Sequence, residues 1–366
     1  MIVLKKDIYW SCNCGFRENA WLSYYWKCPV CGKPLNLDYE KRFEPVGGRG
    51  LARYSNMLPF SPIKTRGEGS TPLVFYEDGI NKILFKLEYL NPSGSFKDRG
   101  SSLALTYAYS LGYKSVVEDT SGNTGVSVAL YSKLYGMKCS IYMPKTAPRG
   151  KKILIKALGG SVIETENREE AALKVAESLN NSFYVAHTWN PIYILGASTI
   201  VYEIYEEFGV PDVVLTPIGS GGLFLGLHMG FRNLSLIENN IRIPYFIAIQ
   251  GCSVQPVYEM IYGYRACGES WLADGIMVVK PPRLDEIVNV ISTNRFRVEL
   301  VNNDDVLNAL RELHEMGFIV EPTSATVWAV YRRIRGDLRN KTILIPLTGS
   351  GLKTLDVWEA ASRSPT

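Results

Sequence analysis

Lys97 lies in a segment whose residue types favour a reactive amine. It belongs to the turn 91–100, Asn-Pro-Ser-Gly-Ser-Phe-Lys-Asp-Arg-Gly, between a strand that ends near Leu90 and a helix expected to begin around Asp98. The positive end of that helix dipole and the neighbouring Phe96 both disfavour a charged ammonium, so they favour the nucleophilic amine. Lysines in exposed loops are common, so the pattern alone is also compatible with an ordinary surface residue.

Three more strand-to-helix turns could hold anionic or polar groups. The turn 120–125, Thr-Ser-Gly-Asn-Thr-Gly, places hydroxyls, a carboxamide and backbone amides at the start of a helix, which suits a carboxylate. The turn 217–223, Pro-Ile-Gly-Ser-Gly-Gly-Leu, lets the backbone approach a phosphate, and its spacing matches neither a dinucleotide site nor a P-loop. The turn 347–353, Leu-Thr-Gly-Ser-Gly-Leu-Lys, places a hydroxyl where it could face a ring nitrogen. Each is also compatible with a plain glycine turn.

The elements that must position these turns alternate between strands and helices from about residue 80. Strands are expected at 83–85, 115–117, 139–143, 182–185, 213–216, 246–249 and 342–346, and helices at 169–179, 199–208 and 306–316 among others. Apolar strands separated by helices predict a mostly parallel sheet that is covered on both faces. Ligands of such sheets bind beyond the carboxyl ends of the strands, so the chemistry is expected at these turns.

The composition excludes several classes of protein. With 46% hydrophobic and 21% charged residues in a chain of 366, disorder over most of the length is not expected. A net charge of +4 without a dense Lys/Arg run does not indicate a nucleic-acid surface. The residues from Met1 to Asp7 lack the apolar core of a signal peptide, and no stretch approaches the roughly 18 apolar residues of a membrane span. We therefore expect a cytoplasmic protein without nucleic-acid or membrane partners.

Four of the seven cysteines cluster near the N-terminus. The segments Cys12-Asn-Cys14-Gly and Cys28-Pro-Val-Cys31-Gly resemble two zinc knuckles, whose four thiolates would close a tetrahedral structural Zn²⁺ site. The second segment has the usual spacing, whereas the first has one residue too few between its cysteines, with Ser11 where a ligand would normally stand. The sequence therefore predicts a zinc ribbon-like module, with a reduced or degenerate ribbon as the alternative.

Taken together, the motifs resemble the threonine synthase branch of fold-type II pyridoxal-phosphate (PLP) enzymes over nearly the whole chain. The matching segments are Gly-Glu-Gly-Ser-Thr-Pro-Leu at 67–73, the turn 91–100, Ser-Gly-Asn at 121–123, Glu321-Pro322 and Thr-Gly-Ser-Gly-Leu-Lys at 348–353. The resemblance implies an α/β fold with two open, twisted, mostly parallel lobes that close over the substrate. We expect the zinc ribbon-like module at 1–42, the larger PLP-binding lobe at 43–94 and 191–366, and the smaller substrate-side lobe at 95–190. A homodimer is also implied.

The resemblance also implies a role for each motif residue. Lys97 would form the Schiff base with PLP and later move protons, and Asn123 would bind the 3′-oxygen of its ring. The amides of Gly219, Ser220, Gly221 and Gly222 would hold the cofactor phosphate, Thr348 would meet the pyridine nitrogen, and Ser121 and Thr124 would bind the substrate carboxylate. A neutral hydroxyl beside the pyridine nitrogen suits elimination and replacement better than transamination.

The reaction itself is less clearly indicated. Threonine synthases carry a segment resembling Asn-Pro-x-Arg-x-Glu-Gly-x-Lys-Thr that helps to receive a substrate phosphate, and this chain has Tyr193, Leu195 and Ser198 at the Arg, Glu and Lys positions. Charge-assisted hydrogen bonds are about twice as strong as neutral ones, so losing two cations there would be costly. Arg149, Lys151 and Lys152 are candidates to compensate from another loop.

Three reactions therefore stay open. The leading hypothesis is conversion of O-phosphohomoserine and water to threonine and phosphate. The second is a β-replacement that makes cysteine or cysteate from O-phosphoserine, or another activated serine, and a sulfur nucleophile; the third is a threonine or serine dehydratase. A non-catalytic scaffold or a ribbon-based interaction module is disfavoured, because Lys97 and all four turns are present. The scattered His187, His228 and His314 are expected to have surface or core roles.

Overall fold

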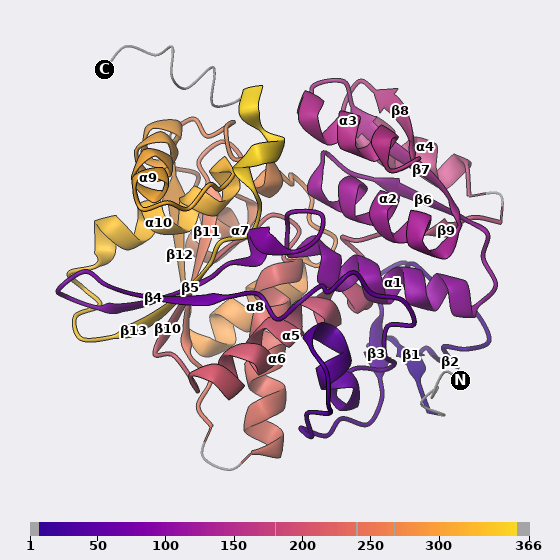
Figure 1. The fold of residues 1–366 in the computed structure, drawn as a ribbon, viewed down its shortest axis with the longest axis horizontal. Helices are drawn as coiled ribbons and strands as arrows, with labels where there is room; N and C mark the ends of the chain where they lie inside the picture. The colour runs from indigo at the N-terminus through magenta and orange to yellow at the C-terminus, as the bar shows by residue number, and fades with distance from the viewer. Residues whose placement is uncertain (1–6, 180, 239–240, 267, 357–366) are drawn as a thin grey trace.

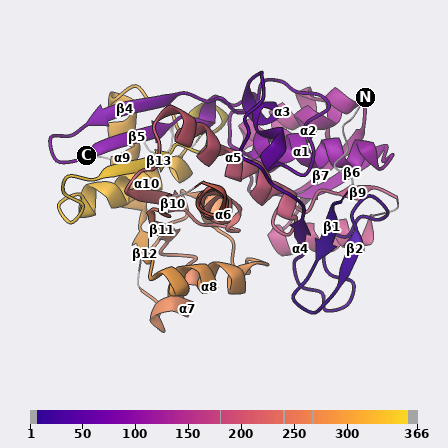
Figure 2. The same cartoon turned by 90° about the horizontal axis from the view of Figure 1, so that it is seen from below.

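Two lobes with central sheets lie side by side in the computed structural model, which describes residues 7–179, 181–238, 241–266 and 268–356 (Figures 1 and 2). The first and last residues of the expected N-terminal module and larger lobe, 1–6 and 357–366, lie outside the described residues. No helix in the described part of the chain has the length and apolar composition needed to cross a bilayer.

The larger lobe is built on a six-stranded sheet with the order β12-β11-β10-β13-β5-β4. Its strands are β4 (Leu73–Glu77), β5 (Lys82–Lys86), β10 (Val213–Pro217), β11 (Tyr245–Gly251), β12 (Arg297–Val301) and β13 (Thr342–Pro346). All neighbours are parallel except β4 and β5, which form an antiparallel edge pair that the sequence pattern did not predict. The helices are α5 (Pro191–Glu207), α6 (Gly222–Ile237), α7 (Pro256–Tyr262), α8 (Leu284–Asn294), α9 (Asn303–Glu315) and α10 (Pro322–Ile334). Short 3-10 helices span Gly50–Met57, Glu88–Leu90, Asp274–Ile276 and Gly351–Lys353.

The smaller lobe has a parallel four-stranded sheet with the order β8-β7-β6-β9. Its strands are β6 (Ser115–Asp119), β7 (Lys138–Pro144), β8 (Ser161–Thr165) and β9 (Phe183–Tyr184), and its helices are α1 (Lys97–Ser110), α2 (Asn123–Tyr135), α3 (Arg149–Ala157) and α4 (Arg168–Glu177). The two lobes are therefore α/β, with a mixed sheet in the larger and a parallel sheet in the smaller. The turns that follow β6, β8, β10 and β13 line one cavity between the lobes.

Helix α5 joins the two lobes through their cores. The Asn190 side chain caps it by accepting from the Ile192 amide at 3.0 Å, and Pro191 occupies the first turn, so the helix begins well before the expected position 199. Every residue of α5 from Pro191 to Ile204 is buried, as expected for a helix that is apolar on nearly all sides. The helix packs against α1 and α6, so the segment 190–199 belongs to the interior.

The N-terminal module forms a layer against the smaller lobe. Its three strands, β1 (Tyr9–Ser11), β2 (Arg17–Asn19) and β3 (Asn36–Asp38), form an antiparallel sheet with the order β2-β1-β3 (Figure 1). Tyr24 stacks on Phe183 of β9 with ring centroids 4.1 Å apart, and its hydroxyl donates to the Tyr184 carbonyl at 2.6 Å. The fully buried Trp10 meets Tyr107 of α1 edge to face. The module is thus part of the hydrophobic core of the smaller lobe.

Candidate active site

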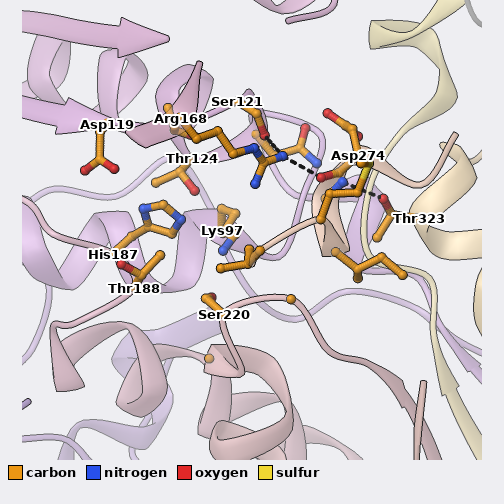
Figure 3. Close-up of a pocket in the computed structure, with 18 of the residues that line it drawn as sticks. Lys97, Asp119, Ser121, Thr124, Arg168, His187, Thr188, Ser220, Asp274 and Thr323 are labelled. Carbon is orange, nitrogen blue, oxygen red and sulfur yellow. Dashed lines mark hydrogen bonds between the residues drawn. The ribbon is translucent and has the colours of Figure 1, made fainter. Parts of the chain in front are cut away.

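A cavity of about 350 Å³ lies between the two lobes, within the range typical of small-molecule sites. Figure 3 shows Lys97 near its centre, with His187 and Thr188 on one side, Ser220 below and Arg168 above. The structure brings all nine predicted cofactor- and substrate-binding residues to this cavity. They are Lys97, Ser121, Asn123, Thr124, Gly219, Ser220, Gly221, Gly222 and Thr348.

Lys97 is the first residue of α1, one position earlier than the expected helix start. Its Nζ lies 4.8 Å from the centroid of the Phe96 ring and has no hydrogen-bond or ion-pair partner among the described residues. Burial lowers the pKa of Lys97 to about 8, although the carboxyls of Glu118 and Glu321 oppose this shift. A substantial fraction of this side chain is therefore a neutral amine near pH 8.

The turn that carries Lys97 is fixed by the buried residues beside it. Asp98 accepts hydrogen bonds from the Ser93 amide at 2.6 Å and from the Ser93 and Ser127 hydroxyls at 2.5 Å each. Lys353 donates to the carbonyls of Ser93 and Gly94 at 3.1 and 2.7 Å. Lys97 therefore enters the cavity from a rigid turn.

The glycine-rich turn between β10 and α6 leaves room for an anion. Gly221 caps α6 with φ of +90°, a left-handed conformation that side-chain-bearing residues rarely adopt. A Cβ on Gly219 would lie 2.7 Å from the backbone oxygen of Gly275, so only glycine fits there without a shift. The first backbone amides of α6 have no intrahelical partner and carry the positive end of the helix dipole. This turn has the properties of a phosphate site.

Polar atoms around Asn123 and Thr348 suit the ring of a cofactor. Asn123 Nδ2 donates to Glu321 Oε1 at 2.7 Å, while its buried Oδ1 has no partner in the described part of the chain. Thr348 Oγ1 shares a hydrogen bond with Ser324 Oγ at 3.0 Å and keeps further capacity on the cavity side. Together with Lys97 and the glycine turn, these groups fit a PLP molecule, because a buried polar atom without a partner calls for a polar ligand.

Three further cations line the cavity: Lys151, Arg168 and Lys280. Arg168 Nη2 donates to Ser121 Oγ at 2.7 Å and to the Asp274 carbonyl at 2.6 Å. Lys151 Nζ lies 3.2 Å from Asp274 Oδ2. Both cations come from the smaller lobe and contact the larger one. Arg168 was not predicted from the sequence, although it occupies another strand-to-helix turn, between β8 and α4.

The segment 190–199 lies elsewhere than expected. Tyr193, at the position of the family's arginine, packs its ring directly against Gly100, and its hydroxyl bonds the Ser101 hydroxyl at 2.9 Å. Leu195 and Ser198 are buried in the same helix, and none of the three lines the cavity. The expectation that this segment faces a substrate phosphate is therefore wrong for these three positions, and their identity removes no cation from the cavity.

The wall next to that helix is formed by His187, Thr188 and Trp189. The expectation of a surface or core role for His187 is therefore incomplete, because this histidine borders the candidate site. His228, in contrast, is buried away from the cavity among the rings of Phe246 and Phe296.

The four N-terminal cysteines come together in the structure. The Sγ atoms of Cys12, Cys14, Cys28 and Cys31 lie within 4.8 Å of one another, with 3.5 Å between Cys12 and Cys31 and between Cys14 and Cys28. A tetrahedral zinc site with Zn–S bonds of about 2.3 Å has sulfur–sulfur edges of about 3.8 Å. The donor set therefore fits Zn²⁺. Ser11 takes no part, because its hydroxyl donates to Asp38 at 2.9 Å.

The chain is similar to known proteins in sequence and in fold. Residues 64–349 match the family described as pyridoxal-phosphate dependent enzyme. The threonine synthase of Methanocaldococcus jannaschii is 29% identical over 368 residues, which cover 92% of this chain and 90% of that protein. The threonine synthase of Methanosarcina acetivorans is 29% identical over 336 residues, which cover 84% of this chain and 82% of that protein.

Solved structures share the fold at lower identity. The O-acetylserine dependent cystathionine beta-synthase of Helicobacter pylori has a TM-score of 0.67 and 23% identity, covering 79% of this chain and 95% of that chain. An O-ureido-L-serine synthase has a TM-score of 0.68 and 19% identity, covering 81% of this chain and 94% of that chain. At this identity the likeness extends to the fold alone.

Proposed function

We propose, since this chain belongs to the pyridoxal-phosphate dependent enzyme family, that it converts O-phosphohomoserine and water to threonine and phosphate. One observation carries the proposal: a single cavity joins Lys97 to the anion-binding turn of α6 and to three further cations. The relatives described as threonine synthases support the same reaction. We further propose that the protein is cytoplasmic, as expected from its N-terminal residues and composition, and that it is a homodimer, as the family resemblance implies.

The cofactor is assigned to Lys97, to the turns after β10 and β13 of the larger lobe, and to Asn123 of the smaller lobe. Lys97 would hold the cofactor covalently, the amides of residues 219–222 would bind its phosphate, Asn123 would bind its 3′-oxygen, and Thr348 would meet its pyridine nitrogen. When bound, PLP supplies an electron sink for carbanion chemistry at the amino acid. The amine of Lys97 then serves as the group that takes and returns protons at the substrate carbons.

The substrate is assigned to the smaller lobe. Because Ser121 Oγ accepts from Arg168, its own proton is free to be donated to a carboxylate. Thr124 and the unpaired amides in the first turn of α2 add further donors. Lys151, Arg168 and Lys280 offer charge to the substrate phosphate, and the contacts of Arg168 and Lys151 with Asp274 hold the lobes together over the cavity.

A β-replacement on O-phosphoserine is the second candidate, because the loop 120–125 resembles that of cysteine synthases and the same cations would bind its phosphate. The third candidate, a dehydratase, needs no phosphate site, so the three cations do not favour it.

Purified, cofactor-loaded protein is expected to release phosphate and threonine in equal amounts from O-phosphohomoserine. Phosphate is measured colorimetrically and amino acids by chromatography. Cysteine or cysteate formed from O-phosphoserine with sulfide or sulfite, without turnover of O-phosphohomoserine, would contradict the proposal and favour β-replacement.

A matched pair of variants tests whether the cations of the cavity bind the substrate phosphate. Arg168→Gln removes a charge-assisted contact and should lower kcat/KM by about 10- to 100-fold. Lys156→Gln neutralises an exposed cation of α3 outside the cavity and should leave kcat/KM unchanged.

We also propose that the cysteine cluster holds a structural Zn²⁺. Cys28→Ser should remove the metal and lower the thermal midpoint, because closed zinc sites contribute directly to folding. The module also packs Trp26 against the cavity residues Tyr184 and Trp189, with centroids 5.3 and 5.2 Å apart, so KM should rise as well.

Metal content is measured by mass spectrometry on protein expressed with added zinc. Cys139→Ser, at a buried cysteine outside the cluster, is the control and should retain the metal. If the wild-type protein contains no zinc, or if Cys28→Ser contains as much zinc as wild type, the cluster is not a zinc site.

A further inference from the structure

His187 and Glu118 form a hydrogen-bonded pair in the cavity wall. His187 Nδ1 lies 2.5 Å from Oε1 of Glu118, a fully buried residue of β6. His187 Nε2 has no hydrogen-bond partner among the described residues, and the ring borders the cavity beside Lys97 and Thr124 (Figure 3). One imidazole nitrogen is therefore tied to a buried carboxyl group, and the other is left for a molecule in the cavity.

The backbone before His187 adopts an unfavourable conformation that positions its imidazole. Ala186, the residue before it, has φ of +50°, a left-handed conformation that is uncommon for non-glycine residues and is often found at functional sites. The amides of Trp189 and Asn190 both donate to the Ala186 carbonyl at 2.8 Å, which closes the turn. The ring of Tyr193 in α5 lies 6.0 Å from the His187 ring and limits its movement.

Burial favours the neutral form of the pair. Burial raises the pKa of Glu118 well above its usual value, and the adjacent Asp119 raises it further. The Lys97 charge and the backbone amides of His187 and Ala186 act in the opposite direction but do not cancel the effect of burial on this pKa. Burial likewise lowers the pKa of His187, and Lys97 of α1 and Arg168 of α4 lower it further. A protonated Glu118 donates to Nδ1, so the remaining imidazole proton lies on Nε2, at the cavity.

We propose that His187 and Glu118 act as a proton relay for the phosphate oxygen that leaves the γ-carbon of the substrate and for the water that then adds at its β-carbon. This inference rests on the proposed function. As the carbon–oxygen bond breaks, its electron pair stays on the leaving oxygen, which takes the Nε2 proton. The Glu118 proton then moves to Nδ1, and the carboxylate is left ionised. When water adds to the substrate, it gives a proton to Nε2, and the Nδ1 proton returns to Glu118.

The decisive variant is Glu118→Gln. A glutamine amide can still donate to Nδ1 and keep the tautomer and the cavity shape, but it cannot pass a proton on. We expect kcat to fall by about 10²- to 10⁴-fold, with the KM and the visible spectrum of the bound cofactor unchanged. The kcat of His187→Asn should fall by the same factor. The kcat of the double variant should be no lower than that of either single variant, because the effects of substitutions in residues that act as a unit do not add.

The control is His228→Asn, which replaces another buried histidine outside the cavity and should keep kcat within about twofold of wild type. If Glu118→Gln keeps the wild-type kcat, or changes KM alone, the relay is wrong and Glu118 only shapes the cavity. If wild-type protein uses O-phosphoserine and sulfide instead, the proposed function fails, and the same kcat comparison with that substrate still decides the relay.

A measurement without substrate decides the point independently. The chain has three histidines, so nitrogen-15 spectra of labelled, cofactor-loaded protein can be assigned with His187→Asn and His228→Asn. A relay in its resting form shows a proton on His187 Nε2 and none on Nδ1 from pH 6 to 8. A proton on Nδ1 with a bare Nε2 would overturn the relay whatever the substrate.

Discussion

Lys97→Ala is expected to abolish the visible absorbance that the cofactor shows when joined to the wild-type protein, and to lower turnover by about 10³-fold or more. The reason is that Lys97 lies in the cavity beside the glycine turn with its amine unpaired, and burial lowers its pKa to about 8. The measurement is an absorption spectrum of protein treated with PLP and freed of excess cofactor by gel filtration.

Lys353 provides a matched control for this assignment. Burial also lowers the pKa of Lys353 to about 8, but its Nζ donates to the carbonyls of Ser93 and Gly94, and it does not line the cavity. Lys353→Ala should therefore keep the absorbance band. A band that survives in Lys97→Ala and disappears in Lys353→Ala would move the covalent attachment to Lys353.

The sequence was most informative at the strand-to-helix turns. Membership of the PLP-dependent enzyme family is confirmed, and the four turns meet at one cavity. For the turns after β5, β10 and β13 this meeting was predictable, because these strands are parallel neighbours in one sheet and end at the same edge. The turn 120–125 follows β6 of the other sheet, so the packing of the two lobes brings it to the cavity. The antiparallel edge strand β4 was not predicted, since its mostly exposed residues carry no continuous apolar run.

Contacts between residues far apart in the chain could not be predicted from the sequence. Arg168 meets Asp274 across the cavity, although 106 positions separate them, and neither residue belongs to a recognised motif. Within the smaller lobe, His187 pairs with Glu118 of β6, a strand with the sequence Ser-Val-Val-Glu-Asp that matches no recognised motif. The segment 190–199 was placed at the substrate by analogy, but its apolar side chains favour an internal helix, and hydrophobic burial decided its position.

The rigidity of the Lys97 turn depends on a buried charge network around Arg99, which is fully buried. The Arg99 guanidinium donates to both carboxylate oxygens of Glu88 at 2.8 and 2.7 Å and to both of Glu203 at 2.7 and 2.8 Å. Lys86 Nζ lies 2.7 Å from Glu203 Oε2. Two cations and two carboxylates thus balance in the interior, and they tie α1 to β5 and α5 two residues beyond Lys97.

Arg99→Met is expected to lower the free energy of unfolding by about 3–5 kcal/mol, because it leaves two buried carboxylates facing one cation. The measurement is urea denaturation followed by fluorescence. The control is Arg332→Met, at a half-exposed arginine paired with Glu312, which should cost less than about 1 kcal/mol. Equal losses in the two variants would show that the buried network adds nothing to stability.

The pH dependence separates lost charge balance from lost packing. Burial alone would raise the pKa of Glu203, but Arg99 and Lys86 lower it to about 2, below the value of about 4.3 in an unfolded chain. The network therefore stabilises wild type above about pH 4 and loses this contribution as the pH falls toward 2. In Arg99→Met the carboxyls take up protons more easily, so the difference in unfolding free energy between wild type and variant should shrink from pH 7 to pH 4. A difference that stays constant over this range would assign the effect to packing of the arginine side chain rather than to its charge.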